Sequence, residues 1–217
     1  DMPVYAPIIY RRWEFGDGNY SLTQNPQYTY DTTGTYTVLL INKSLNGCID
    51  SVEKTVTVHP FPVAGFMADT ACAGQMVCFT DTSWVLYSSI DERHWDFGHS
   101  GMESNDSIAC TIYPDTGTYL VNLIVTSEYG CSSFAERIIT VHPNPIADFS
   151  MVPEYGVPPL DVQFMNYSTG ADTWFWDFGD LNNSTAEHPL HTYNTESIFN
   201  VILVAENEYT CKDTAYG

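Results

Sequence analysis

The chain has 217 residues, of which 44% are hydrophobic, so it is long enough for one large domain or two to three small ones. Its 27 acidic residues against 7 basic ones give a net charge of −20, which argues against nucleic-acid binding because phosphate backbones are bound by basic patches. No run of 18 apolar residues occurs, so no membrane insertion is expected.

A phrase made of Trp, an acidic residue, Phe and Gly occurs three times along the chain. It reads WEFG at 13–16, WDFG at 95–98 and WDFG at 176–179, at intervals of 82 and 81 residues. The stretch TVTVHPFPVAGF at 55–66 likewise matches IITVHPNPIADF at 138–149. Three repeats of about 82 residues therefore follow one another.

Within each repeat the residue pattern is that of short strands. Tyr36, Val38 and Leu40 alternate with polar residues, as a half-buried strand requires, and no stretch has a helical period. In the second repeat, strands are expected at 63–66, 77–80 and 137–141, in addition to the strand that carries the Trp. Short strands separated by Gly, Asn, Asp and Pro turns predict an all-β chain of tandem immunoglobulin-like β-sandwiches.

These patterns divide the chain into residues 1–59, 60–142 and 143–217. Only the second repeat contains every expected strand, whereas the first lacks its first strands and the third lacks its closing strand. We interpret the sequence as a window of a longer array; the alternative is that neighbouring copies donate the missing strands. The Pro-rich linkers HPFP and HPNP predict that successive sandwiches form a semi-rigid rod.

The repeated segments resemble the polycystic-kidney-disease (PKD) repeat. That family's signature is similar to WEFGDG at 13–18, to HPLHTY at 188–193 and to the GTYTVLL segment at 34–40. Matching segments recur in all three repeats, and the resemblance covers nearly the whole chain. The Cys-containing turns also resemble PKD arrays in large secreted and cell-surface adhesins of Bacteroidota, including gliding-motility adhesins. The resemblance implies PKD-type β-sandwiches.

The Trp-Phe-Gly phrase itself has a structural interpretation rather than a ligand-binding one. The Trp and Phe lie two residues apart on one strand face, so both are expected in the core, and the Gly is expected where the strand ends with positive φ or close packing. The structural motif comprises Trp13, Phe15, Gly16, Trp95, Phe97, Gly98, Trp176, Phe178 and Gly179.

Six cysteines predict an oxidising compartment, and the four in the second repeat allow three pairings. Cys78 and Cys110 occupy neighbouring strands in the PKD fold, so the resemblance implies a Cys78–Cys110 disulfide. Cys72 and Cys131 are expected in turns near the same end of the sandwich, which gives Cys72–Cys131. Cys211 is then expected to be free or intermolecular, while Cys48 would pair with a residue in a strand missing upstream.

The sequence also contains candidate calcium-binding and glycosylation sites. Some PKD modules of secreted hydrolases bind calcium near domain seams, and the weak calcium candidates are Asp69, Asp81, Asp148 and Asp161, with a solvated acidic surface as the alternative. No other cofactor or metal is expected. Five Asp-Ser/Thr sequences match an O-glycan acceptor pattern known in Bacteroidota, which gives candidate glycosylation at Thr32, Ser51, Thr70, Ser107 and Thr214.

No recurring set of acid, base and nucleophile occurs, so no catalytic residue is proposed and the chain is not expected to be an enzyme. The expected function is a non-catalytic extracellular or cell-surface stalk and adhesion segment of a larger protein. Its expected partners are other extracellular proteins or glycans and the neighbouring repeats of the same chain. Contacts would use exposed aromatic residues: Tyr20, Trp84, Tyr87, Tyr129 and Trp174.

Two alternatives stay open at this point. The chain would instead be an accessory substrate-binding region if a hydrolase domain belonged to the same protein. It would be a subunit of an extracellular filament, hence a homo-polymer, if a strand of one copy completed the sandwich of the next.

Overall fold

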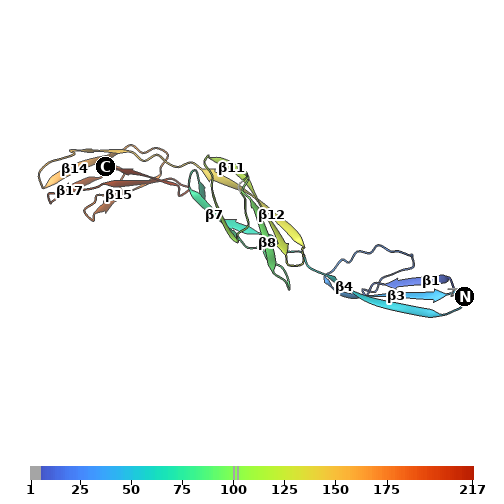
Figure 1. The fold of residues 1–217 in the computed structure, drawn as a ribbon. Helices are drawn as coiled ribbons and strands as arrows, with labels where there is room; N and C mark the ends of the chain where they lie inside the picture. Colours follow the sequence, from blue (N-terminus) through green and yellow to red (C-terminus); the bar gives the residue numbers. More distant parts are fainter. Residues whose placement is uncertain (1–5, 100, 102) are drawn as a thin grey trace. The chain divides into compact units, whose positions relative to one another are not determined.

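The structure is a computed structural model that describes residues 6–99, 101 and 103–217. These residues form 19 strands and no helix (Figure 1), so the predicted all-β class is confirmed. A helix able to cross a bilayer is accordingly absent from the described part of the chain. Every sheet takes its strands from one of the three predicted repeats, which are called the first, second and third modules below.

The chain divides into two compact units. The first comprises the residues up to Val63 together with Trp84–Asp91 and Thr126–Ser133. The second comprises Ala64–Ser83, Glu92–Val125 and Phe134–Gly217. The first module therefore shares its unit with two loops of the second module, and the rest of the second module shares a unit with the third.

The first module has a single antiparallel sheet in the order β2-β1-β3-β4. Strands β1, β3 and β4 lie side by side in Figure 1. Its elements are β1 (Ile8–Glu14), β2 (Tyr20–Ser21), β3 (Gly34–Ser44) and β4 (Ile49–Val58). Among the described residues no strand of this module forms an opposing sheet.

The second module is a complete sandwich of two sheets, β10-β7-β5 and β6-β12-β11-β8-β9. Alternate residues of facing strands, such as Phe79 and Trp95, fill the core with no exposed surface. Its elements are β5 (Phe66–Ala68), β6 (Ala71–Cys72), β7 (Met76–Asp81), β8 (Ile90–Asp96), β9 (Glu103–Ser104), β10 (Ile108–Ile112), β11 (Gly117–Ser127) and β12 (Ser132–His142).

The third module repeats this plan with the sheets β13-β14-β17 and β16-β15-β18-β19. Its elements are β13 (Phe149–Val152), β14 (Leu160–Asn166), β15 (Thr173–Asp177), β16 (Asn183–Ser184), β17 (Leu190–Tyr193), β18 (Ile202–Glu206) and β19 (Lys212–Tyr216). The last element, β19, pairs along the whole of β18 with five residues, and the expected lack of a closing strand stays a prediction.

Candidate functional site

The repeated Trp side chains occupy the centres of the two complete cores. Trp95 and Trp176 have no exposed surface. Trp95 Nε1 donates a hydrogen bond to the carbonyl of Asp106 at 2.8 Å, and Trp176 Nε1 donates one to the carbonyl of Ala186 at 2.9 Å. Both rings are thus enclosed and satisfied by their own module, which leaves no face for a ligand.

The Gly of the phrase allows two backbone segments to approach each other closely. Gly98 and Gly179 have φ angles of 71° and 77°, in the region that favours glycine. A Cβ on Gly98 would lie 2.4 Å from the carbonyl oxygen of Leu120, and one on Gly179 would lie 2.7 Å from that of Asn200. The structural interpretation of the phrase therefore has a steric reason at the Gly and a packing reason at the Trp.

A tyrosine that sequence reasoning did not single out is tied to the phrase in every module. Its hydroxyl donates to the carbonyl of the phrase's Phe in three equivalent bonds: Tyr30 to Phe15 at 2.9 Å, Tyr113 to Phe97 at 3.0 Å and Tyr193 to Phe178 at 3.0 Å. Burial raises the pKa of Tyr113 and of Tyr193 to about 12. The signal was present in the sequence as a Tyr 17 or 18 residues after each Trp.

The residue after the Gly forms a hydrogen-bonded pair whose members change together between modules. The pairs are Asp17 with Tyr28, His99 with Thr111 at 2.9 Å, and Asp180 with His191 at 2.8 Å. Burial alone would raise the pKa of Asp180, but hydrogen bonds from His191 and Asn182 outweigh it and the pKa is lowered. The replacement of Asp by His99 in the second module is therefore matched by a new partner.

One of the two expected disulfides is present. Cys78 and Cys110 face each other across β7 and β10 and are bonded. The expected Cys72–Cys131 pair is wrong, because Cys72 lies on β6, which pairs with the last residues of β12, whereas Cys131 precedes the first residue of that strand. Eleven strand residues separate the two positions, roughly 35 Å.

Cys72 is instead bonded to Cys211 of the third module, so the expectation that Cys211 is free or intermolecular is also wrong. Cys72 is 7% exposed and Cys211 is fully buried. Cys48 and Cys131 are the free cysteines among the described residues. Reasoning within one repeat could not find this pair, because its two halves lie in different modules.

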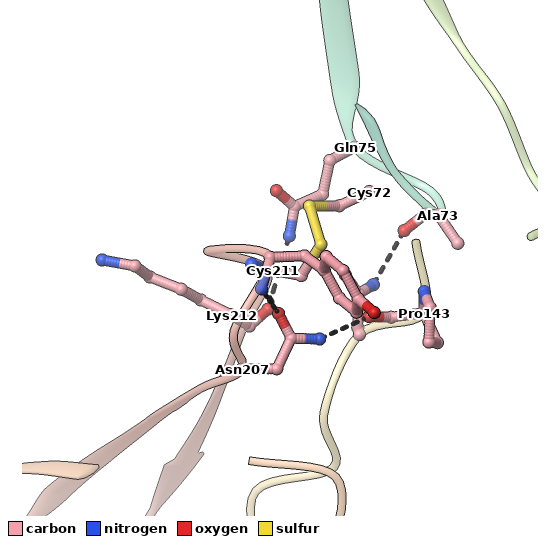
Figure 2. The surroundings of a disulfide bond; sticks show 9 residues. Cys72, Ala73, Gln75, Pro143, Asn207, Cys211 and Lys212 are labelled. Atoms are coloured by element: carbon pink, nitrogen blue, oxygen red, sulfur yellow. Dashed lines mark hydrogen bonds between the residues drawn. A yellow bond between two sulfur atoms is a disulfide. The ribbon is translucent and has the colours of Figure 1, made fainter. Parts of the chain in front are cut away.

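Hydrogen bonds surround the Cys72–Cys211 bridge and join the second module to the third (Figure 2). Asn207 Nδ2 donates to the carbonyl of Pro143 at 2.8 Å, and Gln75 Nε2 donates to the carbonyl of Lys212 at 3.3 Å. Across the same linker, Asn144 Nδ2 donates to the carbonyl of Ala73 at 2.7 Å. The disulfide therefore belongs to a built junction.

An aromatic stack repeats at the equivalent positions of two linkers. The ring of His142 stacks on Tyr209 with centroids 3.8 Å apart, and the ring of His59 stacks on Tyr129 at 3.7 Å. His59 and His142, which precede the linker prolines, are thus fixed by aromatic contacts with the following module's last hairpin. Tyr129, expected to be a contact residue, is 51% exposed and already uses one ring face on His59.

The other residues expected to make contacts differ in exposure. Tyr20, Trp84 and Tyr87 are 59%, 55% and 94% exposed, whereas Trp174 is only partly exposed. Trp84 and Tyr87 belong to the loop between β7 and β8 together with the exposed Leu86, and Tyr87 has a φ of 55°. Trp84 and Tyr87 are the two of the five expected contact residues that lie in the same loop.

The calcium candidates do not come together. Asp81 is hydrogen-bonded by Arg93 at 2.6 Å, and Asp161 accepts from Thr192 at 2.6 Å. Within the described ranges, no three His, Cys, Asp or Glu side chains converge in a metal-binding arrangement. Calcium binding at Asp69 or Asp148 stays a prediction. Of the candidate glycosylation residues, Thr32, Ser51, Thr70 and Ser107 are exposed and Thr214 is partly buried, which leaves glycosylation a prediction too.

A surface pocket of about 420 Å³ lies in the third module beside Gly217. Leu160, Phe199 and Val201 supply its apolar wall, with Tyr155 at the rim. In the second module the last residues of β12 lie between β6 and β11 at the corresponding place, where Val141 is 2% exposed. No small ligand is assigned to this pocket.

The geometry defines a class of protein before any relative is considered: tandem immunoglobulin-like β-sandwiches whose repeated motif builds the cores. The model of the PKD domain family matches residues 5–60 and 142–216. The chain belongs to the PKD domain family.

Two solved PKD structures are similar to this chain. The PKD1 domain of Vibrio anguillarum Epp is 27% identical, with a TM-score of 0.37, over 40% of this chain and 99% of that one. The PKD1 domain of the Vibrio cholerae metalloprotease PrtV is 28% identical, with a TM-score of 0.34, over 39% of this chain and 98% of that one.

Proposed function

We propose that this PKD segment is a non-catalytic, extracellular stalk and adhesion segment that contacts glycans or other proteins through the exposed loop Trp84–Tyr87. Two disulfides support an oxidising, extracellular location, because such bonds are rarely kept in reducing compartments. The resemblance of the sequence to surface adhesins of Bacteroidota leads us to include in this proposal that the segment belongs to an adhesin of that kind. No catalytic role is assigned, since the phrase that recurs in each module serves the core.

The single observation that carries this proposal is the exposure of apolar side chains that the module's own core does not use. Phe79 and Trp95 flank this loop and are 16 residues apart, whereas the equivalent Phe164 and Trp176 are 12 apart. The extra length of the loop in the second module thus holds Trp84, Leu86 and Tyr87 in solvent. Grouped exposed apolar residues of this kind mark binding surfaces, and aromatic rings stack on sugars as well as on proteins.

The backbone of the loop supports the same conclusion. Tyr87 is 94% exposed although its φ of 55° costs a non-glycine residue about 1–2 kcal/mol. The loop is also fixed at its base, because Val63 and Trp84 form a β-bridge and Ser88 Oγ donates to Glu128 at 3.0 Å. A loop that is fixed at its base and presents an exposed aromatic residue in an unfavourable backbone conformation is typical of a recognition site.

Affinity electrophoresis tests this function with the whole chain. The protein is run in native gels that contain xylan, laminarin or galactan, and retardation reports binding. We expect the Trp84→Ala/Tyr87→Ala variant to lose the retardation. The matched control is Phe134→Ala, which removes an aromatic side chain that is 64% exposed on β12, outside the loop. Equal retardation of both variants would contradict the loop as the binding surface.

A second candidate function is favoured by the pocket beside Gly217. A neighbouring copy that inserted a strand against the apolar residues of this pocket would build a polymer. Sedimentation velocity at increasing protein concentration tests this candidate. A single monomeric species at every concentration would exclude it.

A further inference from the structure

The Cys72–Cys211 disulfide connects positions near the start of the second module and near the end of the third. The two cysteines are separated by 139 residues in the sequence. The bridge therefore closes residues 73–210 into a covalent loop that contains almost all of both modules and the linker between them. The Cys78–Cys110 disulfide, with a separation of 32 residues, lies entirely inside that loop.

We propose that this disulfide transmits tension directly from the second module to the third, so that the residues between the two cysteines are not stretched when the chain is pulled. The proposal rests on the proposed function of the segment as a stalk, which is the condition under which tension arises. Force that enters at Ala64 reaches Cys72 after nine residues, crosses the sulfur–sulfur bond, and leaves through the seven residues from Cys211 to Gly217. Residues 73–210 are then off the covalent load path.

The shielded part contains what tension would otherwise pull apart. Both buried Trp residues, Trp95 and Trp176, lie in the loop, as does the linker at Pro143. Within the second and third modules, the covalent load path contains β5, β6 and β19, three short strands of three, two and five residues. Tension can strip these strands from their sheets, but a covalent bond stops it there, whereas an unbridged sandwich continues to unravel.

The surroundings of the bridge are suited to that role. Cys72 and Cys211 are 7% and 0% exposed, so access of an attacking thiol, on which exchange depends, is restricted. Asn207 Oδ1 accepts a hydrogen bond from the backbone N–H of Cys211 at 3.0 Å, while its Nδ2 holds the carbonyl of Pro143 (Figure 2). The side that bears the load is thus fixed to the linker as well as bonded to the second module.

Single-molecule pulling of the whole chain from its two termini under non-reducing conditions tests the proposal. The wild-type protein is compared with the Cys72→Ser/Cys211→Ser variant, in which the Cys78–Cys110 bond is kept. The difference between the two separations, 139 and 32, is 107 residues. We expect the variant to release roughly 350–390 Å more contour length, at about 3.3–3.6 Å per residue.

The matched control is Cys78→Ser/Cys110→Ser, which removes a disulfide of the same module that lies off the load path. Its contour length is expected to equal that of the wild type. If the junction variant does not fold, the same control variant is pulled with and without a reductant. Reduction then opens only the junction bridge, and a gain of 139 residues, roughly 460–500 Å, is expected.

Equal contour lengths of the wild type and the junction variant would overturn the proposal, and so would an oxidised protein whose non-reduced peptide map lacks the Cys72–Cys211 link. Gel retardation by polysaccharide depends on Trp84 and Tyr87 rather than on this bridge. Absence of retardation of the wild-type protein, with the length difference intact, would reject the proposed adhesion alone. Retention of binding by the wild-type protein, with equal contour lengths of the wild type and the junction variant, would reject the mechanical role of the bridge alone.

Discussion

The first and third modules carry the same Trp-Phe-Gly phrase but bury it to different extents. In the third module, Phe149 and Phe164 of the facing sheet pack on Trp176 with ring centroids 5.1 and 5.5 Å away. In the first module, Trp13 is partly exposed, and its Nε1 has no hydrogen-bond partner among the described residues. The phrase therefore specifies a strand and its turn locally, whereas burial of the Trp depends on a second sheet.

The first module compensates in part with its own tyrosines. Tyr28 stacks on Phe15 with centroids 3.8 Å apart, and Tyr30 stacks on Tyr36 at 4.1 Å. These rings come from the segment between β2 and β3 and from β3 itself, so they cover the phrase without a facing sheet. As a result, Phe15 is 5% exposed although Trp13, two residues earlier, is not buried.

The largest expected difference between the modules concerns the Trp itself. Trp176→Ala should lower the free energy of unfolding of the third module by about 3–5 kcal/mol, because it empties a closed core. Trp13→Ala should lower that of the first module by less than about 2 kcal/mol, because its ring already contacts solvent. Hydrogen exchange of peptides from β18 and β3 in the whole chain measures both. Equal losses would contradict the comparison.

The Gly of the phrase should affect the two modules alike, because its contact is local in both. A Cβ on Gly16 or on Gly179 would lie 2.7 Å from a backbone oxygen, that of Thr37 or Asn200. Substitution by Ala should cost roughly 2–4 kcal/mol, from the left-handed φ together with the overlap.

Gly170→Ala is the control for that pair, with a φ of 72° but 3.7 Å of clearance from Pro145. It should cost only about 1–2 kcal/mol, the part due to φ. Thermal unfolding of the three variants measures the difference. A cost at Gly170 equal to that at Gly179 would show that the close approach contributes nothing.

Alkaline pH should separate the modules through their equivalent tyrosines. Burial raises the pKa of Tyr193 to about 12 from an ordinary value of 10, so the folded state holds this proton more tightly than the unfolded state. The resulting stabilisation is complete below pH 10 and is lost as the pH rises to about 12, by roughly 1–3 kcal/mol. Burial also raises the pKa of Tyr30, but this residue is only partly buried and a smaller loss is expected.

The variant Tyr193→Phe provides the measurement of that effect. Its unfolding free energy, followed by hydrogen exchange of the third module from pH 9 upward, should decline less steeply than that of the wild type. Tyr30→Phe is the matched variant in the first module and should alter the slope less. Parallel slopes for Tyr193→Phe and the wild type would contradict the origin of the effect in this hydroxyl.

Features confined to one repeat could be predicted from the sequence. Alternation in a strand specifies which side chains face the core, so the burial of Trp95 and Trp176 followed from the phrase. The Cys78–Cys110 bond also followed, because those residues are direct neighbours across two adjacent strands. The same argument failed for Cys72, whose partner Cys211 belongs to the next module, and no pattern within a repeat encodes a contact between repeats.

Local capping interactions were the other feature that could be predicted only in part. The hydroxyls of Tyr36 and Tyr119 donate to the carbonyls of Thr32 and Asp115, four residues earlier, at 2.8 and 3.0 Å, which is the geometry of a tyrosine corner. Trp84 and Tyr87 of the exposed loop could be predicted as contact residues because they are aromatic. The bridge from Trp84 to Val63 at the base of this loop is a tertiary contact and has no sequence signal.

The smallest expected effect comes from giving the third module a tyrosine hydrogen bond that the first module already has. Phe199 occupies the place of Tyr36 and stacks on Tyr193 with centroids 4.3 Å apart, so the ring is in position but has no hydroxyl. Phe199→Tyr should place a donor near the carbonyl of Thr195, four residues earlier, and stabilise the third module by about 0.5–1 kcal/mol. Tyr36→Phe should destabilise the first module by a similar amount, and chemical denaturation of both variants measures the pair. Destabilisation by Phe199→Tyr would mean that the segment before β18 differs in conformation from its counterpart in the first module. The two modules would then differ at the tyrosine corner as well as in the burial of the Trp.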